Sequence, residues 1–394
     1  MKMETNHKHR WVILLMFMLA HIANDGLEWV IPPLLPAIRE HFHLSYTEMG
    51  AFFTLFRAFG SLLQAPASYL VLLAPVSTIL VGGLLWTSIG MFLASFSPSY
   101  AMLVWISAVS GIGRSTYHPL AVSMLSRTFS RDFLGRAIGF HLSASAIGHV
   151  LAPFLVVLLL QNYGWRLPLQ VWSFIGLVAG VSLFFFLRRQ RVDFQAKGKS
   201  WSWPFLSRPL GFYLLSIGVW GIAQSGISTF IPLFLVDQRG FSAERAAAVY
   251  GLMSIAGVFC RPLLGALMDW MGRRKPVINA GFIISGMAIL GLTTLETPWV
   301  MYLNITLIGI FVAGHSGLAD TFMVELIPAH RREETLGFTY TLRMGTAATS
   351  PFIVGLLSEC MGLLNVFSIM GVISILSAFI LSFAEEKPWK GNSE

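Results

Sequence analysis

Long apolar segments, separated by short polar ones, follow one another along the whole chain of 394 residues. Each approaches or exceeds the length of about 20 residues that a helix needs to cross a bilayer. Because lipid offers no hydrogen bonds to the backbone, such segments must be helices. We predict twelve of them, at residues 11–37, 47–70, 77–96, 100–126, 135–160, 166–187, 210–236, 244–268, 276–294, 298–326, 335–359 and 363–383. The pattern predicts an all-α, multi-pass membrane protein.

Composition and charge agree with this interpretation. Hydrophobic residues make up 55% of the chain and charged residues 12%, against about 25% charge in a soluble domain. The net charge of +8 alone could indicate a nucleic-acid partner, but with the N-terminus inside most Lys and Arg fall in cytoplasmic segments. This asymmetry is the positive-inside rule, and it predicts a cytoplasmic (inner) membrane protein with both termini in the cytoplasm and no nucleic-acid partner. The predicted outer loops hold only Arg39, Arg166, Arg239 and Arg245.

The chain also matches itself at an offset of 198 residues. Gly139-Phe140 corresponds to Gly337-Phe338, and Pro153-Phe154 corresponds to Pro351-Phe352. Two duplicated halves of six helices each are typical of secondary transporters. We predict an N-terminal six-helix bundle, a cytoplasmic linker and a C-terminal six-helix bundle at residues 1–187, 188–209 and 210–394.

The charged residues that interrupt the apolar spans of the first half include Asp25, Glu28 and Arg114. A charge at the bilayer centre costs about 2.5–3.5 kcal/mol on the insertion scale and is functional by default. Asp25 and Glu28 are three residues apart and therefore share a helix face. Burial disfavours the charged form of an acid and a nearby cation favours it, so an acid between both effects can load and release a proton. The alternative is a static ion pair that stabilises the first bundle.

Between the eighth and ninth spans lies the sequence Gly265-Ala-Leu-Met-Asp269-Trp-Met-Gly272-Arg273-Arg274-Lys275. It resembles the loop motif of the major facilitator superfamily, a turn glycine, a carboxylate and a basic cluster. The resemblance implies the major facilitator fold, twelve transmembrane helices in two six-helix bundles. It also implies a gating role for Asp269, Arg273 and Arg274. The first-half counterpart, residues 68–75, carries no charge.

The first 155 residues resemble more closely the fosmidomycin-resistance branch of the superfamily, whose members are proton-coupled efflux proteins. The resemblance implies that Asp25 and Arg114 form the proton switch, with Glu28 beside them. It also implies that spans one, four, seven and ten line the central cavity. It rests on His21-Ile-Ala-Asn24-Asp25-Gly, Ile31-Pro32-Pro33-Leu-Leu-Pro36, Leu44-Ser45, Ser61-Leu-Leu-Gln64 and Gly111-Ile-Gly113…Tyr117-His118-Pro119 in order.

Several further polar residues on the spans are candidates for substrate binding. Imidazole titrates near neutral pH, so a histidine in a span can bind substrate or relay a proton, or simply hydrogen-bond to a neighbouring helix. The excess of arginine over carboxylate in the spans is consistent with an anionic substrate, because guanidinium matches carboxylate and phosphonate groups. The alternative is that each arginine is neutralised by carbonyl groups or by Asp320. The candidates are Arg57, Tyr117, His118, Trp220, Gln224, His315 and Arg343.

We therefore expect a proton-coupled secondary transporter that exports small organic compounds by alternating access, and we expect it to be a monomer. Gly148-His-Val-Leu-Ala152-Pro153 resembles an antiporter motif and favours export. The alternatives are a proton-coupled uptake symporter for an organic anion such as a carboxylate, and a receptor or scaffold built on the same fold. The sequence has no ATP-binding motif, no hydrolytic triad and no Cys/His metal constellation, so we expect neither an enzyme nor a cofactor.

Overall fold

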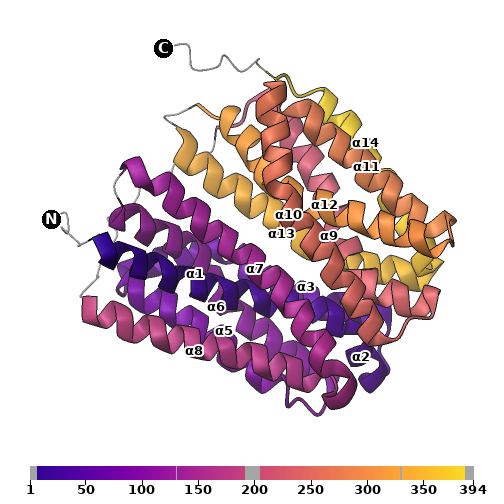
Figure 1. The fold of residues 1–394 in the computed structure, drawn as a ribbon, viewed down its shortest axis with the longest axis horizontal. Coiled ribbons are helices and arrows are strands. Elements are labelled where there is room, and N and C mark those ends of the chain that lie inside the picture. Colours follow the sequence, from indigo (N-terminus) through magenta and orange to yellow (C-terminus); the bar gives the residue numbers. More distant parts are fainter. Residues whose placement is uncertain (1–6, 130, 191–204, 329–330, 387–394) are drawn as a thin grey trace. The chain divides into compact units, whose positions relative to one another are not determined.

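The computed structural model describes residues 7–129, 131–190, 205–328 and 331–386, and the regular structure in these ranges is helical (Figure 1). The helices of the first half of the chain are α1 (His7–Trp29), α2 (Ile31–Phe42), α3 (Tyr46–Leu62), α4 (Gln64–Ala67), the 3-10 helix η1 (Ser68–Leu72), α5 (Val76–Ala94), α6 (Tyr100–Thr128), α7 (Arg131–Tyr163) and α8 (Arg166–Gln190). Those of the second half are α9 (Arg208–Arg239), α10 (Ala243–Met271), α11 (Lys275–Thr294), α12 (Pro298–Glu325), α13 (Arg332–Met361) and α14 (Leu363–Ser382).

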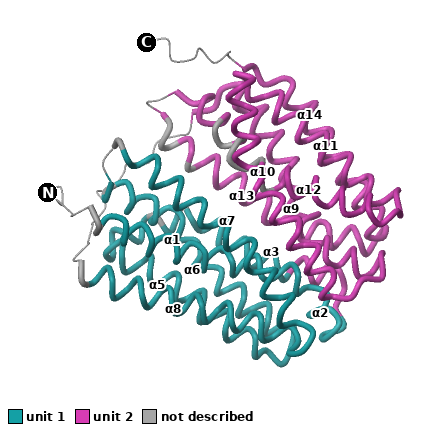
Figure 2. Tube along the Cα trace, viewed as in Figure 1, with its two compact units in different colours: residues 1–43, 52–200 teal, residues 44–51, 201–394 magenta. Residues whose placement is uncertain are grey.

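The chain forms two compact units (Figure 2). Unit 1 contains residues 1–43 and 52–200, and unit 2 contains residues 44–51 and 201–394. Within unit 2, the backbone N–H of Tyr46 donates to Glu359 at 2.5 Å and its hydroxyl donates to Asp237 at 2.7 Å. The start of α3 therefore belongs to unit 2, whereas the sequence places it in the predicted N-terminal bundle, residues 1–187. Most of the predicted linker, at residues 188–209, lies outside the described residues.

The same helix pairs recur in both units. In unit 1, α1 packs against α7 and α8, and α5 packs against α6 and α8. In unit 2, α9 packs against α13 and α14, and α11 packs against α12 and α14. This correspondence is what a duplicated six-helix sequence should give. The predicted fold, twelve transmembrane helices in two bundles, is confirmed.

Eight of the described spans are long and apolar enough to cross a membrane on length and composition alone. The other four transmembrane helices are α3, α6, α12 and α13. Three of these four contain an arginine: Arg57 on α3, Arg114 on α6 and Arg343 on α13.

The first span is bent, although the sequence predicts one continuous helix there. Helix α1 ends at Trp29 and α2 begins at Ile31, directly before Pro32 and Pro33. A proline has no N–H to donate to the preceding turn, and its ring collides with the carbonyl four residues earlier. The bend follows the segment of α1 that carries the acids.

Candidate functional site

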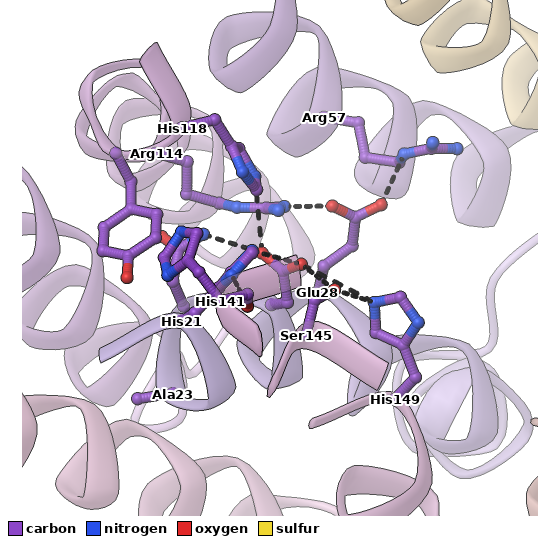
Figure 3. Close-up of polar contacts among 12 residues, drawn as sticks. His21, Ala23, Glu28, Arg57, Arg114, His118, His141, Ser145 and His149 are labelled. Atoms are coloured by element: carbon purple, nitrogen blue, oxygen red, sulfur yellow. Dashed lines mark hydrogen bonds and ion pairs between the residues drawn. The ribbon is translucent and has the colours of Figure 1, made fainter. Parts of the chain in front are cut away.

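Helix α1 presents three ionisable side chains to the interior of unit 1. His21, Asp25 and Glu28 follow one another at spacings of four and three residues, which places them along one helix face. Asp25 is 7% exposed and His21 is 1% exposed. Helices α3, α6 and α7 supply the groups that meet them (Figure 3). The site is therefore assembled inside the first bundle from four helices.

Glu28 is shared by two arginines. Its Oε1 lies 2.9 Å from Nε of Arg57 on α3, and its Oε2 pairs with a guanidinium nitrogen of Arg114 on α6 (Figure 3). Arg114 is 8% exposed, and its guanidinium also lies 5.3 Å from the centre of the Phe56 ring. Its buried Nε has no hydrogen-bond partner among the described residues. One carboxylate thus faces two guanidinium groups.

Asp25 lies in a different environment, surrounded by imidazoles and neutral donors. Its Oδ1 accepts a hydrogen bond from the Asn24 side chain at 2.9 Å and lies 3.4 Å from Nε2 of His118. Its Oδ2 accepts from the Ser145 hydroxyl at 2.5 Å and lies 3.3 Å from His21 Nε2 and 3.6 Å from His149 Nε2. The two acids of α1 therefore have separate partners, arginines for Glu28 and histidines for Asp25.

The ring orientation of His21 is fixed by a carbonyl on α7. Its Nδ1 lies 2.8 Å from the backbone oxygen of His141, so Nδ1 must carry the proton and donate. The two imidazole rings stack with 4.2 Å between their centres. Nε2 of His21 is buried and makes no hydrogen bond of acceptable geometry among the described residues, although Asp25 is close.

The structure brings together most of the site residues predicted in the first half, but with different pairing. The resemblance implies a switch between Asp25 and Arg114, whereas Arg114 contacts Glu28 in the structure. His118 joins the Asp25 group and Arg57 joins the Glu28 group. Helix spacing alone could not decide which of two acids on one face would meet an arginine on another helix.

Tyr117 takes a packing position. Its side chain is fully buried, and its hydroxyl donates to the backbone oxygen of Phe17 at 2.8 Å. This hydrogen bond joins α6 to α1, and it uses the only proton that the Tyr117 hydroxyl can donate. Substrate binding by Tyr117 stays a prediction.

In unit 2 two of the predicted residues, Trp220 and Gln224, belong to a neutral polar cluster between helices. The side-chain amide of Gln224 on α9 donates to Ser285 on α11 at 3.2 Å and to Ser374 on α14 at 3.1 Å. Trp220 donates to Ser285 at 3.4 Å, and the guanidinium of Arg343 lies 5.1 Å from the Tyr340 ring centre. The side chain of His315, on α12, is outside the described part of the chain. A role for these four residues in substrate binding stays a prediction.

Sequence reasoning assigned no functional role to His21, Ser145 or His149. One local signal was available, since His21 lies four residues before Asp25 and Ser145 lies four residues before His149. No spacing could reveal that α1 and α7 lie side by side. Likewise, the sequence has no recognisable metal constellation, yet the ligand atoms of His21, Asp25 and His118 all lie within 4.8 Å of one another.

Comparison with known proteins gives the family. A model of the Major Facilitator Superfamily matches residues 17–351, and a further match covers residues 262–394. The chain belongs to the Major Facilitator Superfamily. Its fold is that of a multi-pass membrane transporter, as the loop motif implies, and members of this superfamily are not enzymes.

Three relatives illustrate the range within the superfamily. The fosmidomycin resistance protein of Escherichia coli is 22% identical over 388 residues, which cover 94% of this chain and 92% of that one. A probable 4-methylmuconolactone transporter of Cupriavidus pinatubonensis is 29% identical over 312 residues, 73% of this chain and 69% of that one. A crystal structure of a bacterial homologue of the human lysosomal transporter Spinster, inward-facing and occupied, superposes with a TM-score of 0.84 at 17% identity, covering 96% and 97% of the two chains.

Ion pairs join the residues of the superfamily loop motif in unit 2. Arg274 pairs with Asp269 at 2.7 Å and with Glu325 at 3.3 Å. The hydrogen bond to Asp269 raises the pKa of Arg274, so this guanidinium stays charged at any cellular pH. Between them Gly272 has φ of 62°, a left-handed conformation that suits glycine and ends α10. In the first half, the uncharged counterpart is the 3-10 helix η1.

Glu386 completes this cluster from the far end of the chain. Its Oε1 accepts from the backbone N–H groups of Arg274 and Lys275, and its Oε2 lies 3.6 Å from Nε of Arg273. The side chain is 5% exposed. A carboxylate that accepts from the first N–H groups of a helix acts as its N-terminal cap. Glu386 therefore fixes the start of α11 and one side of the motif.

We expect Glu386→Ala to destabilise unit 2 by about 1–2 kcal/mol, the usual effect of removing a helix cap. Thermal unfolding of the purified protein in detergent measures this as a lower midpoint. The matched control is Glu385→Ala, which removes the exposed neighbouring carboxylate and should leave the midpoint unchanged. Equal midpoints for the two variants would contradict the capping role.

Proposed function

We propose that the protein is a proton-coupled secondary transporter of small organic anions that works by alternating access, and that Glu28 is its coupling acid. The observation that carries this proposal is the sharing of Glu28 between Arg57 and Arg114 inside the first bundle. Charged groups within transmembrane segments mark substrate and proton pathways.

The arrangement supports coupling by exchange of partners. While Glu28 is ionised it occupies both guanidinium groups. A substrate carboxylate or similar anion that takes over Arg57 and Arg114 leaves Glu28 without its cations, and this favours protonation of Glu28. Proton and anion then bind together, and the loaded site carries one of each. Release of the anion returns the arginines to Glu28 and expels the proton.

Glu28 alone suffices for this step. Asp25, the other acid expected to couple protons, meets histidines and neutral donors instead of arginine. The substrate-binding role that we propose for Arg57 and Arg114 uses the bidentate hydrogen bonding of guanidinium to planar anions. The Nε of Arg114, which has no hydrogen-bond partner among the described residues, supplies a further donor.

Export of small compounds, the direction that the sequence favours, is the second candidate. Its supports are the likeness to a protein named for fosmidomycin resistance and the close packing of Gly148 on α7 against α1. In an exporter, protons would move inward while the substrate moves outward. We propose the cytoplasmic membrane as the location, with both termini in the cytoplasm and a monomer as the working unit.

Purified protein in liposomes that contain a pH-sensitive dye tests both candidates. Substrates are added on one side without a pH gradient, as a panel of carboxylates, sulfonates, phosphonates, lactones and fosmidomycin. Co-transport predicts that protons enter together with the anion, so the lumen acidifies. Exchange predicts that the lumen becomes alkaline as substrate enters. If no compound in the panel moves protons in either direction, both proposals are wrong.

A further inference from the structure

Apart from the Glu28 group, unit 1 contains a second cluster whose chemistry differs from that of an anion site. It consists of His21 and Asp25 on α1 and His118 on α6, with His149 of α7 at its edge (Figure 3). We propose that His21, Asp25 and His118 form a binding site for a divalent first-row transition-metal ion such as Zn²⁺. Imidazole nitrogen and carboxylate oxygen are the donors that such ions prefer.

The distances suit coordination. His21 Nε2 and His118 Nε2 lie 3.3 and 3.4 Å from the nearer oxygens of the Asp25 carboxylate. Ligand atoms about 2.0–2.1 Å from a tetrahedral ion are separated by about 3.3–3.4 Å. Counting one ligand atom from each residue, the three atoms lie within 4.8 Å of one another. Small side-chain adjustments bring them around one ion.

The tautomer of His21 gives an independent reason. Because its Nδ1 donates to the His141 carbonyl, the neutral ring has a lone pair on Nε2. That lone pair is buried and faces the Asp25 carboxylate, and two acceptors cannot form a hydrogen bond with each other. A cation between the two groups satisfies both. A histidine that donates its other nitrogen to a backbone carbonyl is the usual form of a metal-ligating histidine.

The surroundings complete the site. The hydroxyl of Ser145 and the amide of Asn24 each donate to one oxygen of Asp25, which orients the carboxylate. The His118 side chain is 37% exposed, which leaves an accessible side for the ion to enter and for water or a fourth ligand to bind. His149 Nε2, 3.6 Å from Asp25, also lies 3.0 Å from the Ser145 oxygen and donates to it, because the Ser145 hydroxyl proton is directed at Asp25. An ion held there joins α1 to α6.

Zinc titration of the metal-stripped, full-length protein in detergent tests the proposal by calorimetry. We expect one Zn²⁺ per chain, with X-ray absorption showing nitrogen and oxygen ligands only, and no heat with Mg²⁺. His21→Ala and His118→Ala should each weaken Zn²⁺ binding at least about tenfold. The matched control His41→Ala removes an exposed imidazole of α2 and should leave the affinity unchanged.

Two results would overturn the metal site: no binding of Zn²⁺ by the wild-type protein, or equal affinity in wild type, His21→Ala and His118→Ala. Size-exclusion chromatography of each variant serves as the control for folding. The inference stands apart from the coupling proposal, because Glu28→Gln is expected to bind Zn²⁺ like the wild type. A protein that binds Zn²⁺ but does not transport, or the reverse, separates the two proposals.

Discussion

Glu28→Gln is expected to abolish proton-coupled substrate movement, with a loss of at least about 100-fold in initial rate, or about 2.7 kcal/mol. The amide cannot exchange a proton, and it leaves Arg57 and Arg114 without their counter-charge. Removing one partner of a fully buried ion pair costs about 3–5 kcal/mol. The Glu28 side chain is 19% exposed, so we expect a smaller loss of stability and a lower unfolding temperature. The rate of lumen acidification in liposomes measures the first effect, and thermal unfolding measures the second.

A charge-balanced double variant separates lost stability from lost coupling. Glu28→Gln with Arg57→Gln restores the excess of a single positive charge that the wild-type group has. We expect this double variant to recover much of the thermal stability and still to lack coupled transport. Glu40→Gln, which changes an exposed acid of α2, serves as the neutral control. Wild-type coupling in Glu28→Gln would remove Glu28 from the mechanism.

Gly148→Val is expected to destabilise unit 1 by about 3 kcal/mol, near the upper end of the usual cost of overpacking. A β-carbon at Gly148 would lie 2.6 Å from the backbone oxygen of Ile22 and 3.2 Å from the backbone nitrogen of Gly26. These are backbone atoms of α1 and cannot rotate away. The helices would have to separate at the level of Asp25. Thermal unfolding and the yield of monodisperse protein measure the effect.

The control for this substitution lies on the same helix. Gly139 of α7 has no atom within 4 Å of the position that its β-carbon would take. Gly139→Val should therefore change stability by less than about 0.5 kcal/mol. Equal unfolding midpoints for the valine variants of Gly148 and Gly139 would show that close packing of α7 on α1 does not matter.

The fold could be predicted from the sequence because its determinants are local and repeated. Each span is recognisable by its length and apolar composition, and the 198-residue offset predicts that the second half repeats the first. The recurrence of the helix pairs α1–α7 and α9–α13 agrees with that offset. The bend at Val30 departs from the predicted first span, because two adjacent prolines follow it.

The sequence predicts the charged residues of the site, but it predicts only part of the contacts that they make with one another. Asp25, Glu28 and Arg114 were found because charge is costly in lipid. Which acid meets Arg114 depends on how α1 is rotated about its axis relative to α6. Asp25 and Glu28 are only three residues apart on α1, and in the structure Glu28 makes the contact. The histidines around Asp25 come from three helices, α1, α6 and α7. The distance between Asp25 and His118 along the chain does not predict that these helices meet.

The helix pair that holds Asp25 has a counterpart with different chemistry. In unit 1 the α1–α7 contact includes Ser145 donating to the Asp25 carboxylate, whereas the α9–α13 contact of unit 2 includes Ser225 donating to the backbone oxygen of Ala347. The serine hydrogen bond between the two helices therefore goes to a carboxylate in the α1–α7 pair and to a backbone carbonyl in the α9–α13 pair. Duplication therefore left two copies that could diverge independently. Side chains at the α9–α13 contact can therefore change without altering the ionisable groups of the α1–α7 contact.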